Sequence, residues 1–444
     1  MGIIFSVTGT RAAGPAAIDD AGALPARKMS EGLPMVEKLL VHRRAVLQGA
    51  IGLATAGVAG LPPAPALAQA AQGVTDNEIL IGALGQLTGP FAFIGAPGRD
   101  NIQMAMEHLN AAGGINGRKL RLIYEHASTP AESVAAAKKL VENDKVFVLI
   151  IASGSTGAAA AADYVRAAQI PTYNTVGATP IIREPFARNI FHGTIPPASV
   201  TGQAMIDIGF QAVPKATRVG VLAGTYAFPQ SHLAEIEPRL AKRGGLEVVV
   251  EKFDAAARDY TAQLVSFARR RAQIVLILGS FTEAGFAIKQ APEKGLTDCM
   301  FVLDGSAVNN AVIPLIGEEN TKSVWGYFNA PYFPTQDDPP IAGYRRLLIE
   351  KIGTLPQGRP NIYDLIGYGS TYVLAQVLKK AGRGLSWPRV IDAWETLNDA
   401  KPSDMGGYDV IFPETVTPTD HQGNKKVASA RIINSSWRVV GLAS

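Results

Sequence analysis

Hydrophobic residues along this chain alternate between short runs that favour β-strands and longer segments with the spacing of one helix face. Residues 79–84, 120–124 and 146–152 are runs of the first kind and predict the first three strands. Between the first two runs, apolar residues recur at helical spacing over residues 102–109. We expect this helix to end at the glycine pair 113–114, because glycine readily takes a left-handed conformation.

The next helix has a clear start in the sequence. Thr129 is suited to the N-cap, Pro130 to the first helical position and Glu132 to the third. Together they predict a capping box, in which the two polar side chains bond to free backbone N–H groups. These residues have a structural role and carry no chemistry.

A second set of strands and helices follows the first. The predicted strands are residues 219–222, 246–253, 274–278 and 301–303, and the predicted helices are residues 231–242, 260–271 and 283–293. Alternation of this kind predicts an α/β fold with parallel sheets and crossover helices. Because the set occurs twice, we predict two similar lobes, each a doubly wound parallel sheet.

The end of the chain is expected to serve both lobes. Predicted helices near residues 364–381 and 387–397 complete the first lobe before the chain returns to the second. Pro-rich or polar segments at residues 195–197, 329–340 and 401–408 are candidate crossings. The predicted lobes are residues 75–197 plus 331–405, and residues 198–330 plus 406–444.

The beginning of the chain has the layout of a cleavable export signal at residues 42–68. Arg43 and Arg44 precede an uncharged run rich in Gly and Ala, which is too short to span a bilayer. We expect cleavage near Ala68 and a mature protein in the periplasm. Residues 1–41 are an extension of uncertain role.

The paired arginines resemble a twin-arginine export signal, which carries folded proteins across the inner membrane. An ordinary secretory signal with two basic residues is the alternative. Both interpretations predict the same compartment.

Composition narrows the class of protein further. The single cysteine, Cys299, excludes an internal disulfide, and no cysteine stands beside the cleavage position to carry a lipid. The net charge of +4 is spread along the chain without a basic block, so we expect no binding to nucleic acid or to an anionic membrane.

Five short motifs occur where predicted strands end or begin. They are Leu87-Thr88-Gly89-Pro90, the segment 110–118, Ser153-Gly154-Ser155-Thr156, Ala178-Thr179-Pro180 and Asp304-Gly305. In this order they resemble the extracellular solute-binding proteins for leucine, isoleucine and valine, of the type I periplasmic binding protein family. The similarity covers the chain from about Asn77 to its end.

The resemblance implies a function as well as a fold. It implies two lobes joined by three crossover segments, which close on a small solute and pass it to the inner-membrane permease subunits of an ATP-driven importer. It implies a monomer that needs no cofactor and no metal. The ligand would be a branched-chain or other apolar amino acid; the alternatives are an aromatic or other small carboxylate, or a role as a ligand sensor acting through a partner protein.

Ser155 and Thr156 are the first candidate ligand contacts. They stand at the turn from a buried strand into an Ala-rich helix, where free backbone N–H groups attract anions. Their hydroxyls and amides are suited to a carboxylate; a plain helix-capping role is the alternative. Gly177 and Thr179 resemble the family's second carboxylate-binding loop, although a simple turn before Pro180 would explain them too.

Asp304 is the residue expected to decide the ligand class. It directly follows the predicted strand 301–303, and the resemblance implies that its carboxylate pairs with the ammonium group of an amino acid. A solvated loop aspartate or a helix cap is the alternative.

Four apolar residues are candidates for the rest of the pocket: Phe93, Ile94, Phe228 and Phe281. The two later phenylalanines fall near positions where many family members carry a hydroxyl-bearing residue, which puts the exact ligand in doubt. Rings without hydroxyls suit a ligand with a bulkier aliphatic or aromatic side chain. Each of the four could equally belong to the core.

The sequence argues against an enzyme. None of its six histidines lies in a metal-binding spacing or beside a Gly-x-Ser-x-Gly motif. The loop 153–156 lacks the lysine of a phosphate-binding loop, and Asp304 has no second carboxylate with which to form an acid–base pair.

Overall fold

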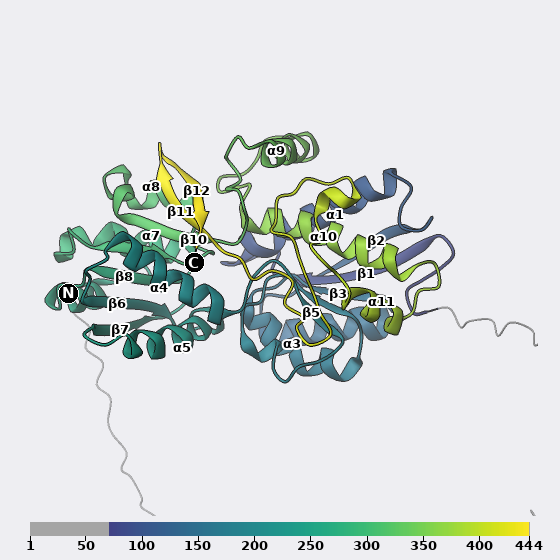
Figure 1. The fold of residues 1–444 in the computed structure, drawn as a ribbon, viewed down its shortest axis with the longest axis horizontal. Coiled ribbons are helices and arrows are strands. Elements are labelled where there is room, and N and C mark those ends of the chain that lie inside the picture. Colours follow the sequence, from purple (N-terminus) through teal and green to yellow (C-terminus); the bar gives the residue numbers. More distant parts are fainter. Residues whose placement is uncertain (1–70, 444) are drawn as a thin grey trace, which may run out of the picture. The chain divides into compact units, whose positions relative to one another are not determined.

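The computed structural model describes residues 71–443 and contains two mainly parallel β-sheets, each with helices on its faces (Figure 1). The predicted fold class is therefore confirmed. The predicted export signal, residues 42–68, and the extension 1–41 lie outside the described residues.

The first sheet has five parallel strands in the order β2–β1–β3–β4–β5. Its strands are β1 (Glu78–Gly85), β2 (Lys119–His126), β3 (Val148–Ile151), β4 (Thr172–Asn174) and β5 (Ile190–His192). From β1 the chain moves first to one side and then to the other. The gap between β1 and β3 is therefore the topological switch point, where crossover helices diverge to opposite faces.

Both faces of this sheet are buried, as its continuous hydrophobic runs require. In β1, Ile79 and Ile81 point to one core cluster while Leu80 and Leu84 point to another. The first cluster includes α1 (Ala92–Ala111) and α10 (Ile362–Ala381). The second includes α2 (Pro130–Lys138) and α3 (Ser155–Ala168).

The second sheet has seven strands in the order β12–β11–β10–β9–β8–β6–β7, with β11 and β12 antiparallel to their neighbours. Its strands are β6 (Arg218–Gly224), β7 (Glu247–Phe253), β8 (Ile274–Leu278), β9 (Met300–Leu303), β10 (Val324–Phe328), β11 (Ala428–Ile433) and β12 (Ser436–Leu442). Here the switch point lies between β6 and β8, in the same place as in the first sheet.

Helices cover both faces of the second sheet as well. They are α4 (Ala198–Ala212), α5 (Ala227–Lys242), α6 (Thr261–Arg269), α7 (Phe281–Gln290) and the short α8 (Ile313–Ile316). In β8, Leu276 packs with α4 and α5, whereas Val275 and Ile277 pack with α6 and α7. The alternation follows from the two-residue period of a strand.

Helices from late in the chain return to the first sheet. α9 (Pro339–Ile352) contacts α1 through Tyr344, whose hydroxyl donates to Asn101 Oδ1 over 2.7 Å. α11 (Trp387–Trp394) contacts the segment before β3, because the Trp387 Nε1–H donates to the carbonyl of Phe147. Farther on, Gln422 pairs with His192 of β5 before the chain enters β11. The predicted lobe boundaries stay a prediction.

Short helical turns complete the secondary structure. A π-helical turn extends α2 at Lys139–Asn143, and 3-10 turns lie at Pro180–Ile182, Pro292–Lys294, Asn310–Val312, Glu318–Ser323 and Pro402–Met405.

One predicted helix start differs instructively from the observed one. The capping box at Thr129 is confirmed, and α1 ends at Ala111 before the positive-φ glycines 113 and 114. However, the helix predicted to begin at residue 283 begins at Phe281. The reason is a second capping box, in which Ser280 accepts from the Glu283 N–H and Glu283 accepts from the Ser280 N–H.

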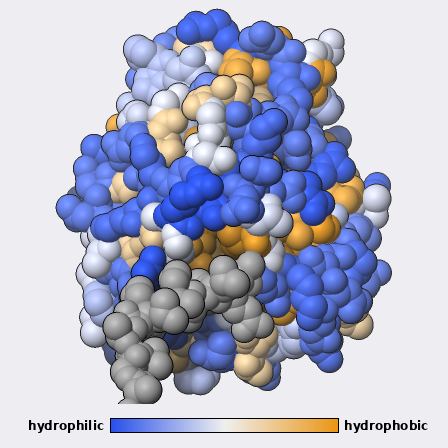
Figure 2. Space-filling model, turned by 90° about the vertical axis from the view of Figure 1, so that its right-hand side faces the viewer, coloured by the Kyte–Doolittle hydropathy of each residue, from blue (hydrophilic) through white to orange (hydrophobic). Residues whose placement is uncertain are grey.

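On the face drawn in Figure 2, hydrophilic residues cover most of the surface and hydrophobic residues form separate patches. Within residues 71–443, no helix has the length and apolar character needed to cross a membrane.

The capping box of α2 gives a stability prediction. Thr129→Ala removes the acceptor of the Glu132 N–H, so the free energy of unfolding should fall by about 1 kcal/mol. Urea unfolding followed by circular dichroism measures this change. Thr419→Ala, at an exposed threonine, is the control, and equal midpoints for the two variants would contradict the assignment.

Candidate ligand-binding site

A cavity of about 110 Å³ lies at the carboxyl ends of strands from both sheets. It is lined by Gln86, Phe91, Phe93, Ile94, Ser128, Gly154, Ser155, Thr156, Val176, Ile195, Tyr226, Phe228, Ser280, Gly305, Ser306, Tyr327, Asn329, Ile362 and Tyr363. Gln86 and Gly154 follow β1 and β3, while Tyr226 and Ser280 follow β6 and β8. Both topological switch points therefore open onto the same cavity, which is where open α/β sheets bind ligands.

One wall of the cavity is the N-terminus of α3. Gly154 is the N-cap in an extended conformation, and no side chain caps the helix. The first intrahelical bond runs from the Ala158 N–H to the Gly154 carbonyl, so the three preceding N–H groups have no partner within the helix. Together with the helix dipole, these groups favour an anion.

Ser155 adds a hydroxyl at this helix end. The side chain is almost fully buried, and its Oγ accepts the Ala178 N–H over 3.1 Å. Because that bond uses an oxygen lone pair, the hydroxyl proton remains available for a donor role. The hydroxyl is thereby held in place by the loop after β4.

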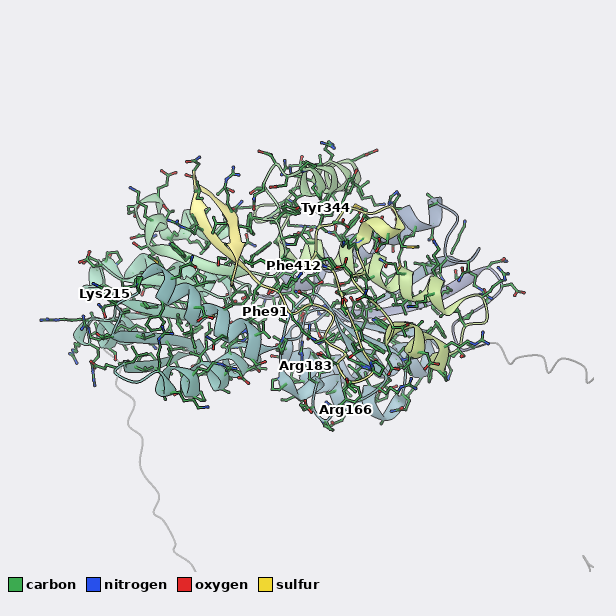
Figure 3. The ribbon with its side chains drawn as sticks, viewed as in Figure 1. Phe91, Arg166, Arg183, Lys215, Tyr344 and Phe412 are labelled. Atoms are coloured by element: carbon green, nitrogen blue, oxygen red, sulfur yellow. The ribbon has the colours of Figure 1, made fainter. Side chains whose placement is uncertain are left out.

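Aromatic rings from both lobes form the apolar walls. Phe91, labelled in Figure 3, lies 5.6 Å from Tyr226 between ring centroids. Phe93 lies 5.8 Å from Tyr363 and 5.2 Å from Phe281, edge to face in both pairs. Contacts of this kind add to the stabilisation that burial of the rings provides. Phe281 thus supports Phe93 from behind.

Tyr226 is fixed by the start of α7. Its hydroxyl donates to Glu283 Oε2 over 2.8 Å, and the same oxygen accepts the Ser280 N–H. Burial, with the nearby Glu283 carboxylate, raises the pKa of Tyr226 far above its usual range, so the phenol stays neutral. The capping box therefore also orients a cavity wall.

Among the described residues, the polar part of the cavity lining contains no ionic side chain. In the described part of the chain, none of the residues that line it is Asp, Glu, Lys, Arg or His. Its polar groups are hydroxyls, amides and backbone. A charged ligand group would have to be held by these neutral groups.

Asp304 lies just behind the lining and is completely buried. Its Oδ2 accepts the Gly279 N–H over 2.6 Å, and its Oδ1 accepts the Ser306 N–H over 2.7 Å. The carboxyl group thus ties the end of β8 to the loop after β9. It is directed toward protein donors, and its partner Ser306 lines the cavity.

Burial raises the pKa of Asp304 to about 7, against the effect of its bonds from Ser306 and Gly279. The Ser306 hydroxyl lies 2.6 Å from Asp304 Oδ1 and 2.9 Å from the Gly279 carbonyl. Having one proton, it can donate to only one of them at a time. When Asp304 is protonated, its O–H can donate to Ser306 Oγ while the serine donates to the carbonyl.

Gly177 and Thr179 are buried in the loop after β4 but do not line the cavity. The Gly177 N–H donates to Asn174 Oδ1, and Thr179 Oγ1 accepts the Ile181 N–H as the cap of a short turn. Arg183, labelled in Figure 3, donates to the carbonyls of both residues. This loop is held by internal bonds.

The structure therefore divides the predicted site residues into two groups. Ser155, Thr156, Phe93, Ile94 and Phe228 line the cavity, whereas Gly177, Thr179, Asp304 and Phe281 do not. Their roles toward a ligand stay predictions.

The sequence interpretation missed several residues that line the cavity, notably Gln86, Ser306 and Asn329. Gln86 directly follows β1, so the rule that pointed to Ser155 could have found it. Asn329 follows β10, but it stands at the start of a segment that the sequence predicted as a crossing. Ser306 follows the motif Asp304-Gly305, in which Asp304 was the expected ligand contact.

The structure gives no metal-binding cluster: within residues 71–443, no group of three or more His, Cys, Asp or Glu side chains is arranged to hold a metal ion. Buried His232 instead bonds to the Thr201 hydroxyl over 2.7 Å inside the second lobe.

Two α/β lobes with a cavity at the carboxyl ends of their strands define a solute-binding clamp. Residues 78–436 match the periplasmic binding protein family, and the chain belongs to this family. The resemblance of its motifs to that family is confirmed. Membership implies a binding protein rather than an enzyme, and a place outside the cytoplasm.

Similar proteins include both amino-acid and aromatic-acid binders. An amino acid binding protein from Pseudomonas aeruginosa is 27% identical over 312 residues, which are 69% of this chain and 79% of that protein. A leucine-binding protein from Thermotoga maritima has a TM-score of 0.69 at 18% identity, covering 82% of this chain and 99% of that one. A solute-binding protein of an ABC transporter from Rhodopseudomonas palustris, solved with 3,4-dihydroxybenzoic acid, has a TM-score of 0.68 at 20% identity, covering 82% and 96%.

The buried Asp304 predicts a pH dependence of stability. Because its pKa is raised to about 7 in the folded protein, the folded state binds more protons than the unfolded state between about pH 4 and pH 7. The unfolding free energy should therefore fall as pH rises through this window, by at most about 1.4 kcal/mol per pH unit from this group. Urea unfolding of wild type and Asp304→Asn across pH 4–8 measures it.

The readout of that experiment is the slope. Asp304→Asn changes hydrogen bonds at every pH, which shifts its curve by a constant amount. Burial raises the pKa of Glu414 to about 8, and this group adds a dependence of the same sign to both proteins. The variant should gain stability relative to wild type as pH rises; parallel curves would show that Asp304 is ionised throughout.

Proposed function

We propose that this protein is the solute-binding component of an ABC importer and that it captures a small aromatic monocarboxylate. The observation that carries the proposal is the lining of the cavity, which combines an uncapped helix N-terminus with aromatic walls and, within the described residues, no ionic side chain.

The carboxylate is assigned to the N-terminus of α3. The backbone N–H groups there lack partners within the helix, and the Ser155 hydroxyl can donate beside them. A carboxylate has two oxygens and can accept several such bonds. Charge-assisted bonds from neutral donors hold an anion without a salt bridge.

The rest of the ligand is assigned to the aromatic walls. Phe91, Phe93 and Tyr363 are packed against other rings, so they keep their orientation when a ligand enters. Pre-oriented rings favour a flat apolar ligand, because stacked and edge-to-face contacts are then available without new ordering.

An ammonium group has less support in this cavity. A desolvated cation needs an opposite charge, and the nearest assigned candidate, Asp304, directs its oxygens toward the N–H groups of Gly279 and Ser306. A ligand without an amine avoids this requirement. The related protein solved with 3,4-dihydroxybenzoic acid shares the fold and gives a precedent for such a ligand.

An apolar amino acid such as leucine is the second candidate. In its favour, Asp304 bonds to Ser306, which lines the cavity, so the carboxyl group is separated from the cavity by the Ser306 side chain. In that case Ser155, Thr156, Gly177 and Thr179 would serve the carboxylate and Asp304 the ammonium. Relatives described as amino-acid or leucine binders support this alternative.

Calorimetric titration separates the two candidates. The purified protein is unfolded and refolded to remove any solute it carries, then titrated with benzoate, 4-hydroxybenzoate and leucine. We expect one-to-one binding of an aromatic acid and none of leucine. Tight binding of leucine that is lost in Asp304→Asn would contradict the proposal and favour the second candidate.

The role of the α3 N-terminus in binding the carboxylate can be tested by substitution. Ser155→Ala should weaken binding of the aromatic acid by about fivefold to tenfold, because one donor to the carboxylate is lost. Ser231→Ala is a control on α5, where the hydroxyl bonds to the Ala227 carbonyl and does not line the cavity. Equal affinity of wild type and Ser155→Ala for the aromatic acid would show that its carboxylate does not bind at this helix end.

A further inference from the structure

Two side-chain amides line the cavity with oxygens that have no hydrogen-bond partner among residues 71–443. Gln86 is 6% exposed and Asn329 is 3% exposed, and both line the cavity. Gln86 Oε1 and Asn329 Oδ1 are buried, and neither has a hydrogen-bond partner within the described residues. Buried amides are normally paired, so each such oxygen calls for an explanation.

The backbone brings both amides to the cavity through close glycine contacts. A Cβ on Gly305 would stand 2.8 Å from Asn329 Nδ2 and 2.7 Å from the Tyr327 ring, so only glycine leaves the amide its present position. A Cβ on Gly95 would stand 2.3 Å from the Gln86 carbonyl oxygen, so glycine lets α1 pack directly against this residue. Close packing thus positions the Asn329 amide and the backbone of Gln86, and both residues are buried.

The two amides belong to different lobes. Gln86 follows β1 of the first sheet, and Asn329 follows β10 of the second. Ser128 gives a useful contrast, because it also lines the cavity but its Oγ already bonds to His126 Nε2 over 3.0 Å. Among these three polar side chains, the two amides are the ones whose oxygens depend on what fills the cavity.

We infer that Gln86 and Asn329 recognise a hydroxyl group on the ring of the ligand, so that the solute is a hydroxylated aromatic carboxylate. This inference rests on the proposed function and specifies its substrate. An amide offers one acceptor and one donor group, and a phenolic hydroxyl can donate to the first and accept from the second. The role assigned to Gln86 and Asn329 therefore does not depend on which position of each amide is the oxygen and which is the nitrogen.

The same geometry disfavours a bare ring. Water can pair with the amides while the cavity is open to solvent, but an unsubstituted ring displaces that water and leaves the oxygens unpaired. A site built to bond a hydroxyl discriminates strongly against the analogue that lacks it. Selectivity between hydroxylated and plain acids is therefore the property to measure.

The experiment compares benzoate, 4-hydroxybenzoate and 3,4-dihydroxybenzoate by calorimetric titration of the refolded protein. At least one hydroxylated acid should bind wild type about tenfold or more tightly than benzoate does. Asn329→Leu and Gln86→Met replace each amide by an apolar side chain of similar size. In at least one of them the preference should shrink to within about threefold while benzoate binding is kept or strengthened.

Ser128→Ala is the matched control. It also removes a polar group from the lining, but one that already has a protein partner, so the preference for the hydroxylated acid should persist. Binding of benzoate by the two amide variants shows that they are folded. If one variant fails to fold, the other variant and the wild-type preference still decide the question.

The outcomes keep the two claims apart. Equal wild-type affinity for benzoate and both hydroxylated acids, or a preference that survives in both amide variants, overturns the role of the amides and leaves the proposed function standing. Binding of leucine with no binding of any aromatic acid overturns the proposed function itself.

Discussion

The site depends on the order of the strands in the two sheets. In each sheet, the connection after the first strand runs to one side and the connection after the third strand runs to the other. The helices that follow these two strands therefore lie on opposite faces and leave one edge of the sheet between them uncovered. At that edge, strand ends and helix N-termini remain accessible, and their backbone groups lack regular partners. Both sheets have this reversal in the same place, and the cavity is where the two edges meet.

The sequence predicted the fold well because its main determinants are local. Runs such as Ile274–Leu278 are fully buried on both sides, and such strands need continuous apolar sequence whatever surrounds them. Helix boundaries were less accurate, since they depend on single polar groups. The start of α7 is set by Ser280 and Glu283, which bond to each other's backbone, and hydrophobic spacing does not detect this.

The site was harder to predict than the fold, and the difficulty has one physical origin. Sequence identifies which residues follow a strand, but the direction of a side chain there depends on donors from other strands. The N-terminus of α3 was found because its backbone geometry is local. Asp304 was placed correctly after β9, but the Gly279 N–H at the end of β8 lies beside it and holds its carboxyl group away from the lining. Asn329 directly follows β10, a strand that was not among those predicted from the sequence.

These contacts explain why an acidic residue lies behind a cavity that, among residues 71–443, is lined by no ionic side chain. Asp304 joins two loops that line the cavity, and its bonds to Gly279 and Ser306 replace the water that burial removes. A neutral residue of similar size could not accept both N–H groups in the same way. The adjacent Gly305 leaves space for the Asn329 amide. Asp304 thus fixes the loop, while Gly305 leaves room for a polar side chain at the cavity. The motif that resembles an ammonium site can therefore be retained when the ligand has no amine, because its structural contribution does not depend on the ligand.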